Sequence, residues 1–308
     1  MRSNLMLLMA ATIWGMGFVA QRLGMDHMGP YTFNGLRFLL GALSLLPLLG
    51  ALSLLPLLWW LKSRQPVAVA GDHRQLLIGG VLAGLVLFCA ASLQQVGLLY
   101  TTAAKAGFIT GLYIILVPVL GLLLRHKSGI NTWIGAFIAL AGLYVLSVTD
   151  EFTIGFGDLL QVVGALFWAV HLLLVDHYSN RVAPIKLAGV QFVVCGLLSL
   201  ATAFVIETPT VSGAVAGWQA LLYAGLVSVG VGYTLQVVGQ RGAHPAHAAI
   251  ILSLETVFAA VGGVLLLGET LDERAIAGCA LMLAGMLISQ IRLRWWWKSR
   301  RDKVPATK

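Results

Sequence analysis

The chain has 308 residues, of which 59% are hydrophobic and only 10% are charged, and its mean hydropathy is +0.89. Because a soluble domain carries about a quarter charged residues, this composition excludes an ordinary soluble protein and indicates a polytopic membrane protein. The net charge of +8 does not indicate nucleic-acid binding, since most of the excess lies in residues 292–308.

Ten apolar segments follow one another along the chain, separated by short stretches that carry charges, glycine or proline. Each segment is long enough to cross a bilayer as a helix, and none shows the alternation that is typical of strands. We therefore expect an all-α integral membrane protein with ten transmembrane helices. The segments cover about residues 4–24, 31–60, 75–98, 102–124, 130–148, 158–178, 184–206, 216–240, 246–267 and 274–292.

The distribution of Lys and Arg predicts the orientation of these helices. With the N-terminus in the cytoplasm, 16 of the 20 Lys and Arg residues fall on the cytoplasmic side, as the positive-inside rule requires. We predict a multi-pass protein of the cell (inner or plasma) membrane with both termini cytoplasmic. Residues 293–308 are predicted to be a basic cytoplasmic tail, and a disordered solubilising tail is compatible with the same composition.

Two internal alignments indicate that the chain repeats itself. The string AATIWGMGFV at 10–19 aligns with GALFWAVHLL at 164–173, at an offset of 154 residues. The string LQQVG at 93–97 aligns with LQVVG at 235–239, at an offset of 142 residues. A tandem copy of GALSLLPLL within the first half accounts for most of the difference between the two offsets.

The repeat divides the chain into two domains, 1–148 and 156–292, with five predicted helices in each. Because five is odd, the second copy enters the membrane from the opposite side, which makes an inverted repeat. Many secondary transporters use this construction to form one site near the middle of the membrane and to expose it to either side in turn. The sequence therefore predicts a transporter that works by alternating access.

Glu255 is the only formal charge between Gly242 and Gly268. Counted from Ala246, it lies about 13 Å along a helix, near the centre of a hydrocarbon core of about 30 Å. Ionisable residues at this depth usually face a bundle interior or a wet cavity, which predicts a role in substrate binding or proton coupling. The alternative is a protonated or paired acid that only holds helices together. Its repeat counterpart is Tyr113.

Other candidate binding residues come from the first two predicted helices and from the sixth. Trp14 and its counterpart Trp168 lie in mid-span, where they could form the wall of a cavity and face an amine; close packing against glycine is the alternative. Asn34 and Arg37 share one face of the second helix. A guanidinium there could bind a substrate carboxylate, or it could extend towards the interface or pair with Glu255.

The remaining candidates are polar residues inside apolar segments. Gln94 and its repeat counterpart Gln236 could hydrogen-bond a substrate, or they could join helices to one another. His171 could take part in a proton relay, although a histidine in a membrane helix is often a satisfied packing residue. The predicted substrate-binding set is completed by Tyr113 and Glu255, and Glu255 is the candidate for proton coupling.

Several classes of chemistry have no support in the sequence. The three cysteines lie in different apolar segments, no Cys/His cluster occurs, and no phosphate-binding GxxxxGK[ST] string is found. We therefore expect no metal, no cofactor and no catalytic residues. The expected partners are a small-molecule substrate and the lipid bilayer, not nucleic acid, and the oligomeric state stays open. A membrane-embedded enzyme and a passive metabolite channel are the alternatives to a secondary transporter.

Three strings carry a family resemblance that covers essentially the whole chain. They are IWGMGFVAQRLG (13–24), GLRFLLGAL (35–43) and SLETVFAAVGGVLLLGETLDERAIAGCALMLAGMLI (253–288). The chain resembles the drug/metabolite transporter superfamily, specifically its EamA-type permeases. The resemblance implies ten helices, cytoplasmic termini, a central cavity and export of amino acids or related metabolites. The chain departs from the family at His126 and Lys127, where an acid is common, and in the tandem GALSLLPLL segment.

Overall fold

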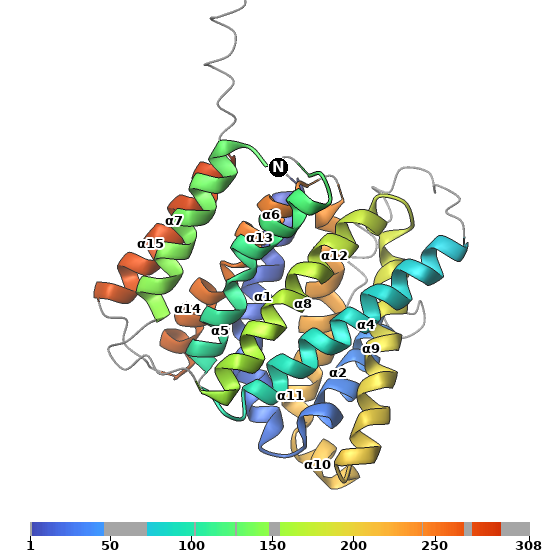
Figure 1. Ribbon diagram of the computed structural model, residues 1–308. Coiled ribbons are helices and arrows are strands. Elements are labelled where there is room, and N and C mark those ends of the chain that lie inside the picture. The colour runs from blue at the N-terminus through green and yellow to red at the C-terminus, as the bar shows by residue number, and fades with distance from the viewer. Residues whose placement is uncertain are drawn as a thin grey trace, which may run out of the picture.

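The computed structural model of the protein describes residues 2–45, 73–101, 103–126, 128–147, 155–241, 243–267 and 273–290. Every regular element in these ranges is a helix (Figure 1). The second GALSLLPLL copy and the predicted tail lie outside the described residues. The helices are α1 (Arg2–Met25), α2 (Pro30–Ser44), α4 (His73–Gly97), α5 (Ala103–Gly111), α6 (Tyr113–Leu123), α7 (Ile130–Ser147), α8 (Phe156–Ser179), α9 (Pro184–Ile206), α10 (Val211–Ala216), α11 (Trp218–Leu222), η1 (Tyr223–Tyr233), α12 (Thr234–Gln240), α13 (Pro245–Leu252), α14 (Glu255–Leu267) and α15 (Glu273–Gln290).

The apolar helices have the lengths that a membrane requires. Within the described residues, six helical stretches are long and apolar enough to cross a bilayer, and two shorter apolar stretches cover Ile130–Val145 and Pro245–Val261. Each of the ten predicted segments contains helix, although the structure describes only the first half of 31–60. The prediction of an all-α membrane protein is therefore confirmed.

The structure corrects the prediction that 102–124 and 246–267 are continuous helices. The first is interrupted at Leu112, between α5 and α6, and the second at Ser253 and Leu254, between α13 and α14. At the second interruption the amides of Leu254 and Thr256 bond to carbonyls three residues earlier, which tightens the turn, and the Ser253 hydroxyl donates to the Ile250 carbonyl. Glu255 therefore begins a helix rather than lying in the middle of one.

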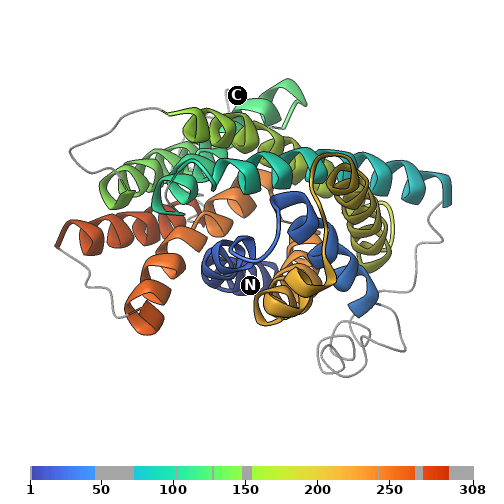
Figure 2. The same ribbon diagram turned by 90° about the horizontal axis from the view of Figure 1, so that it is seen from below.

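The helices form one bundle with a two-helix layer at its side. Helix α4 packs on α8 and α9, α2 packs on α9 and η1, and α1 packs on α12, η1 and α14. Helices α7 and α15 lie side by side as the outer pair (Figures 1 and 2). We call the end that holds residues 26–29, 98–101 and 207–217 the distal end, because the N-terminus lies at the opposite end (Figure 1).

Candidate functional site

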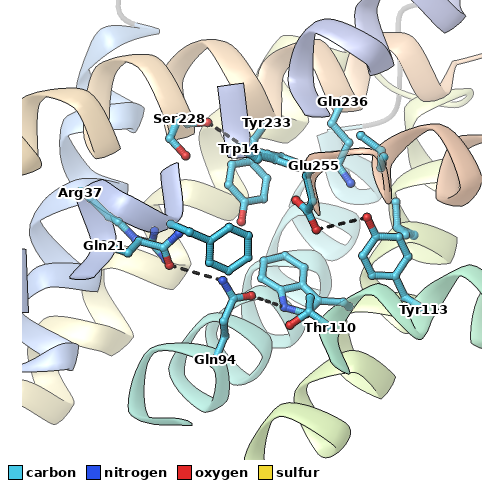
Figure 3. Close-up of a pocket in the computed structure, with 14 residues that line it drawn as sticks. Trp14, Gln21, Arg37, Gln94, Thr110, Tyr113, Ser228, Tyr233, Gln236 and Glu255 are labelled. Atoms are coloured by element: carbon cyan, nitrogen blue, oxygen red, sulfur yellow. Dashed lines mark hydrogen bonds between the residues drawn. The ribbon is translucent and has the colours of Figure 1, made fainter. Parts of the chain in front are cut away.

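A cavity lies between the helices near the middle of the bundle (Figure 3). The empty space inside it is about 510 Å³, including the part that is open to solvent. Each half of the chain contributes seven of the fourteen lining residues, which are Trp14, Phe18, Gln21, Arg37, Gln94, Thr110, Tyr113, Trp168, Leu172, Ser228, Tyr233, Gln236, Leu252 and Glu255.

Seven of the nine predicted binding residues line this cavity. They are Trp14, Arg37, Gln94, Tyr113, Trp168, Gln236 and Glu255. Asn34 does not line it, since its Nδ2 donates to the Ala91 carbonyl of α4 at 3.1 Å. His171 is fully buried beside Trp168, and its Nε2 lies 3.0 Å from Gln191 Oε1 on α9.

Glu255 reaches the cavity from the first residue of α14. Its side chain is only 6% exposed, and its Oε1 accepts a hydrogen bond from the Tyr113 hydroxyl at 3.3 Å (Figure 3). Tyr113 is itself the first residue of α6. A carboxylate at a helix N-terminus is favoured by the helix dipole, so the interruption of the helix helps the bundle to hold this acid.

Arg37 reaches the cavity from α2 and is 3% exposed. Its guanidinium carbon lies 5.6 Å from the centre of the Phe33 ring and 5.0 Å from that of Phe38, which are cation–π contacts. Its Nε has no hydrogen-bond partner among the described residues. A buried cation with an unused donor is costly unless an anion completes its shell, so Arg37 is equipped to bind an anionic group.

Aromatic rings form much of the wall between these two charged groups. Tyr233 lies 4.6 Å from Trp14 and 6.1 Å from Trp168, measured between ring centres. Both indole N–H groups are engaged: Trp14 donates to the Ser228 carbonyl at 3.2 Å, and Trp168 donates to Gln94 Oε1 at 2.8 Å. These bonds fix the orientation of the rings, so the wall is largely formed before any substrate enters.

Sequence reasoning missed several lining residues, among them Tyr233, Thr110, Ser228 and Leu252. A signal for two of them was present: Tyr233 lies three residues before Gln236, and Thr110 three residues before Tyr113, so each shares a helix face with a predicted residue. Ser228 gave no such signal, because its carbonyl contributes to the site by bonding to Trp14.

The fold and the cavity together define a class of protein. An apolar helical bundle encloses a small cavity with aromatic walls, a buried acid and a buried cation. The described residues contain no group of three or more His, Cys, Asp or Glu side chains that could bind a metal. This combination is typical of a multi-pass membrane protein that binds a small polar molecule inside the bundle.

Comparison with known proteins gives the family. The EamA-like transporter family matches residues 1–148 and 155–290, so the chain belongs to this family. A protein of Archaeoglobus fulgidus described as an uncharacterized transporter is 31% identical over 94% of this chain and 86% of its own length. A probable amino-acid metabolite efflux pump of Salmonella typhimurium is 22% identical over 95% of this chain and 96% of its own length.

One solved crystal structure has the same fold, with a TM-score of 0.74 over 98% of this chain and 99% of the other, at 19% sequence identity. The family and the names of the relatives describe transporters and not enzymes. The protein is therefore a multi-pass membrane protein of a transporter family, and its substrate is a small molecule.

Proposed function

We propose that the protein is a secondary transporter that exports an amino acid or a related small metabolite by alternating access around this cavity. Both termini are cytoplasmic in this proposal, and the membrane is the inner or plasma membrane. The observation that carries this proposal is that the cavity contains groups of opposite charge. Among the described residues, one cavity holds a buried guanidinium whose Nε has no partner and a buried carboxylate whose one hydrogen-bond partner is a tyrosine hydroxyl.

The cavity residues support an inverted repeat. Five pairs that line the cavity are related by the two offsets of the sequence repeat: Trp14 with Trp168, Phe18 with Leu172, Gln94 with Gln236, Thr110 with Leu252, and Tyr113 with Glu255. Both copies thus use corresponding positions to build one site. An odd number of helices in each copy gives this arrangement, because the copies then face each other from opposite sides of the membrane.

Contacts between corresponding residues support a pseudo-twofold axis through the bundle. Phe38 and Phe192 differ by 154 residues, and their ring centres lie 6.3 Å apart between α2 and α9. Tyr113 and Glu255 differ by 142 residues and share a hydrogen bond between α6 and α14. Two corresponding residues can touch only near the axis that relates the copies. An axis through the cavity would account for the Tyr113–Glu255 contact.

The helix interruptions support a site near the middle of the membrane. Tyr113 and Glu255 each begin a helix directly after an interruption, one in each copy. Interrupted helices at matching positions of two repeats are a common way to build a transporter site, because the helix ends offer polar groups to the substrate. Glu255 is the one acid of this pair, which supports a single proton-coupling residue.

A zwitterionic substrate fits the charges of the cavity. Figure 3 shows Arg37 and Glu255 on different sides of the cavity, with Tyr233 between them. Arg37 binds the substrate carboxylate, Glu255 binds the ammonium group or the coupled proton, and the tryptophans and Tyr233 surround the apolar part. Gln94 and Gln236 supply neutral hydrogen-bonding groups. Asn34 and His171 support the wall from behind through their bonds to α4 and α9.

Binding of substrate analogues tests this assignment. The Arg37→Gln variant should bind an amino acid more weakly by about 1.5–3 kcal/mol, roughly 10- to 150-fold in affinity, because a charge-assisted contact is lost. Its affinity for the corresponding amide or decarboxylated amine should change little, since neither analogue offers a carboxylate. Thermal-shift titration of purified protein measures both affinities. Equal weakening for acid and amide would show that Arg37 has a structural role.

Counterflow in liposomes separates a transporter from a passive channel. Unlabelled substrate inside the liposomes should accelerate uptake of labelled substrate, because a carrier returns faster when it is loaded. A channel shows no such acceleration. Absence of counterflow for a substrate that binds would overturn alternating access.

A further inference from the structure

The N-terminus of α2 is capped by a residue from the other half of the chain. Gly29 precedes α2 and offers no side-chain cap, and Pro30 occupies the first turn. The amides of Tyr31 and Thr32 instead donate to Glu207, to Oε1 and Oε2 respectively, each at 2.8 Å. The Thr32 hydroxyl donates to Oε2 at 2.6 Å. These are charge-assisted bonds from a helix N-terminus, which is a favourable place for a carboxylate.

The position of the Glu207 carboxylate depends on the absence of a side chain at position 29. A Cβ on Gly29 would lie 2.3 Å from the carboxyl carbon of Glu207 and 2.5 Å from its Oε2. No real side chain tolerates such distances, so any larger residue there would displace the carboxylate. The sequence thus supplies both the acid and the space for it.

The bonds between Glu207 and α2 join the two copies of the repeat, whose relative position changes during alternating access. Glu207 directly follows α9, which belongs to the second copy, whereas α2 belongs to the first. Both lie at the distal end (Figure 1), just outside the apolar stretch Pro184–Ile206. A partly exposed carboxylate at this boundary can leave its partners for water at low cost, which a carboxylate buried in the bundle cannot do.

The contact is connected to the cavity through α2. Thr32 and Arg37 are five residues apart on one helix, so a displacement of the first turn of α2 moves the guanidinium that faces the substrate. Two further polar contacts lie between α1 and the C-terminal part of α4 or the turn after it: Arg22 donates to the Leu98 carbonyl at 3.0 Å, and Gln94 donates to Gln21 at 3.3 Å in the cavity wall.

We propose that Glu207 and the first turn of α2 form a gate that keeps the distal end of the cavity closed and opens once in each transport cycle. The proposal rests on alternating access as proposed above. Substrate binding to Arg37 affects the gate, because Arg37 and the first turn of α2 belong to the same helix. Opening breaks the three bonds to Glu207, and closing restores them.

Accessibility of a cavity cysteine from each side of the membrane tests the gate. The reporter is Phe18→Cys, which lines the cavity, in a chain whose Cys89, Cys195 and Cys279 are replaced. It is labelled with a membrane-impermeant maleimide in right-side-out and in inverted vesicles. The Glu207→Gln variant removes the charge, and the Gly29→Ala variant keeps the charge but displaces the carboxylate.

Both variants should raise the labelling rate from the distal face roughly tenfold and lower it from the other face, because loss of charge-assisted bonds shifts the closed state towards the open one. Thr210→Val is the matched control. Thr210 caps the short helix α10 at the same end, and its hydroxyl bonds to Gly213 of the same segment and not to α2. It should leave both rates unchanged.

The other outcomes are decisive as well. Unchanged labelling in both gate variants overturns the gate, and so does loss of folding in both, since a contact that opens in every cycle cannot be required for the fold. In the chain with Glu207 and Gly29 intact, bound substrate should change the labelling rate of the reporter cysteine. If it changes the rate from neither face, the proposal of alternating access is wrong. If the substrate does alter it there while the gate variants have no effect, only the gate fails.

Discussion

Glu255 has a tyrosine, not a second acid, at the corresponding position of the other repeat, and the two side chains touch. This contact gives the acid one neutral donor and no cation among the hydrogen bonds of the described residues. Because no cation is hydrogen-bonded to it among the described residues, this carboxylate can be protonated or ionised without breaking an ion pair. We therefore propose Glu255 as the residue of the cavity that gains and loses a proton during transport.

The Glu255→Gln variant tests proton coupling. Glutamine has nearly the same shape and can still accept from Tyr113, so the protein should fold, with a melting temperature within about 4 °C of the unmodified chain. Transport driven by a pH gradient should be lost, while some substrate exchange remains. Glu273→Gln, at the exposed start of α15, is the control and should change neither property.

The outcomes differ for a structural acid. Normal gradient-driven uptake by Glu255→Gln would end the proton-coupling proposal. Joint loss of expression and melting temperature would show that the carboxylate holds the bundle together. Uptake, exchange and melting are measured on one preparation.

Single residues were predicted from the sequence where their chemistry was unusual for their surroundings. Arg37 and Glu255 stand out because charges are costly in apolar segments. Trp168 and His171 are three residues apart and both are buried, but the sequence could not tell that His171 faces α9 while Trp168 faces the cavity. Glu207 gave no signal, because acids are common where apolar segments end and its partners lie about 175 residues away.

At the scale of helices, apolar length predicted where elements occur but not where they are interrupted. The segment around Glu255 is apolar apart from a few polar residues such as Ser253 and Thr256, and its interruption needs only a few amides to shift to nearer carbonyls. Such a shift costs little when neighbouring helices determine the backbone path. The π-helical stretch η1 is a similar case, because its sequence is typical of an ordinary apolar helix. In the structure its Ser228 carbonyl accepts a hydrogen bond from the Trp14 indole.

The outer pair of helices is packed closely at several glycines, among them Gly135 and Gly285. A Cβ on Gly285 of α15 would lie 2.5 Å from the Gly135 carbonyl of α7, and a Cβ on Gly135 would lie 2.5 Å from the Gly285 carbonyl. Small residues at such positions let two backbones approach closely inside a membrane, where packing rather than the hydrophobic effect drives association. The two helices therefore lie closer than larger side chains would permit.

Gly285→Ala should lower the free energy of unfolding by about 1–3 kcal/mol, because the added methyl group forces α15 away from α7. Gly189→Ala in α9 is the control. Its nearest neighbour would be a Leu45 methyl group at 3.9 Å, so the better helix propensity of alanine should leave stability unchanged or raise it by up to about 1 kcal/mol. Unfolding in detergent with increasing denaturant measures both, and equal stability changes would contradict the close-packing argument.

For the whole molecule, the internal repeat carried more information than any single segment. It relates Phe38 to Phe192 and Tyr113 to Glu255 at its two offsets, and in the structure the members of each pair touch, which the repeat alone did not predict. It could not predict the contacts that break the symmetry. Gln94 bonds to Trp168, whereas Trp14 bonds to a carbonyl of η1 and not to Gln236, because the two copies have diverged in helix type.

The orientation in the membrane is the last property that the charge distribution predicts and the structure leaves to experiment. The structure places Arg125, Arg181 and Arg241 near the N-terminal end, after α6, α8 and α12, while Val211 lies at the distal end and is 81% exposed. Under the positive-inside rule the arginine-rich end faces the cytoplasm. In intact cells an impermeant thiol reagent should label Val211→Cys and spare Gly129→Cys, an exposed position between α6 and α7. Both should be labelled after the membrane is permeabilised, which controls for reactivity. The reverse pattern would place the N-terminus outside and reverse the side to which the Glu207 gate opens.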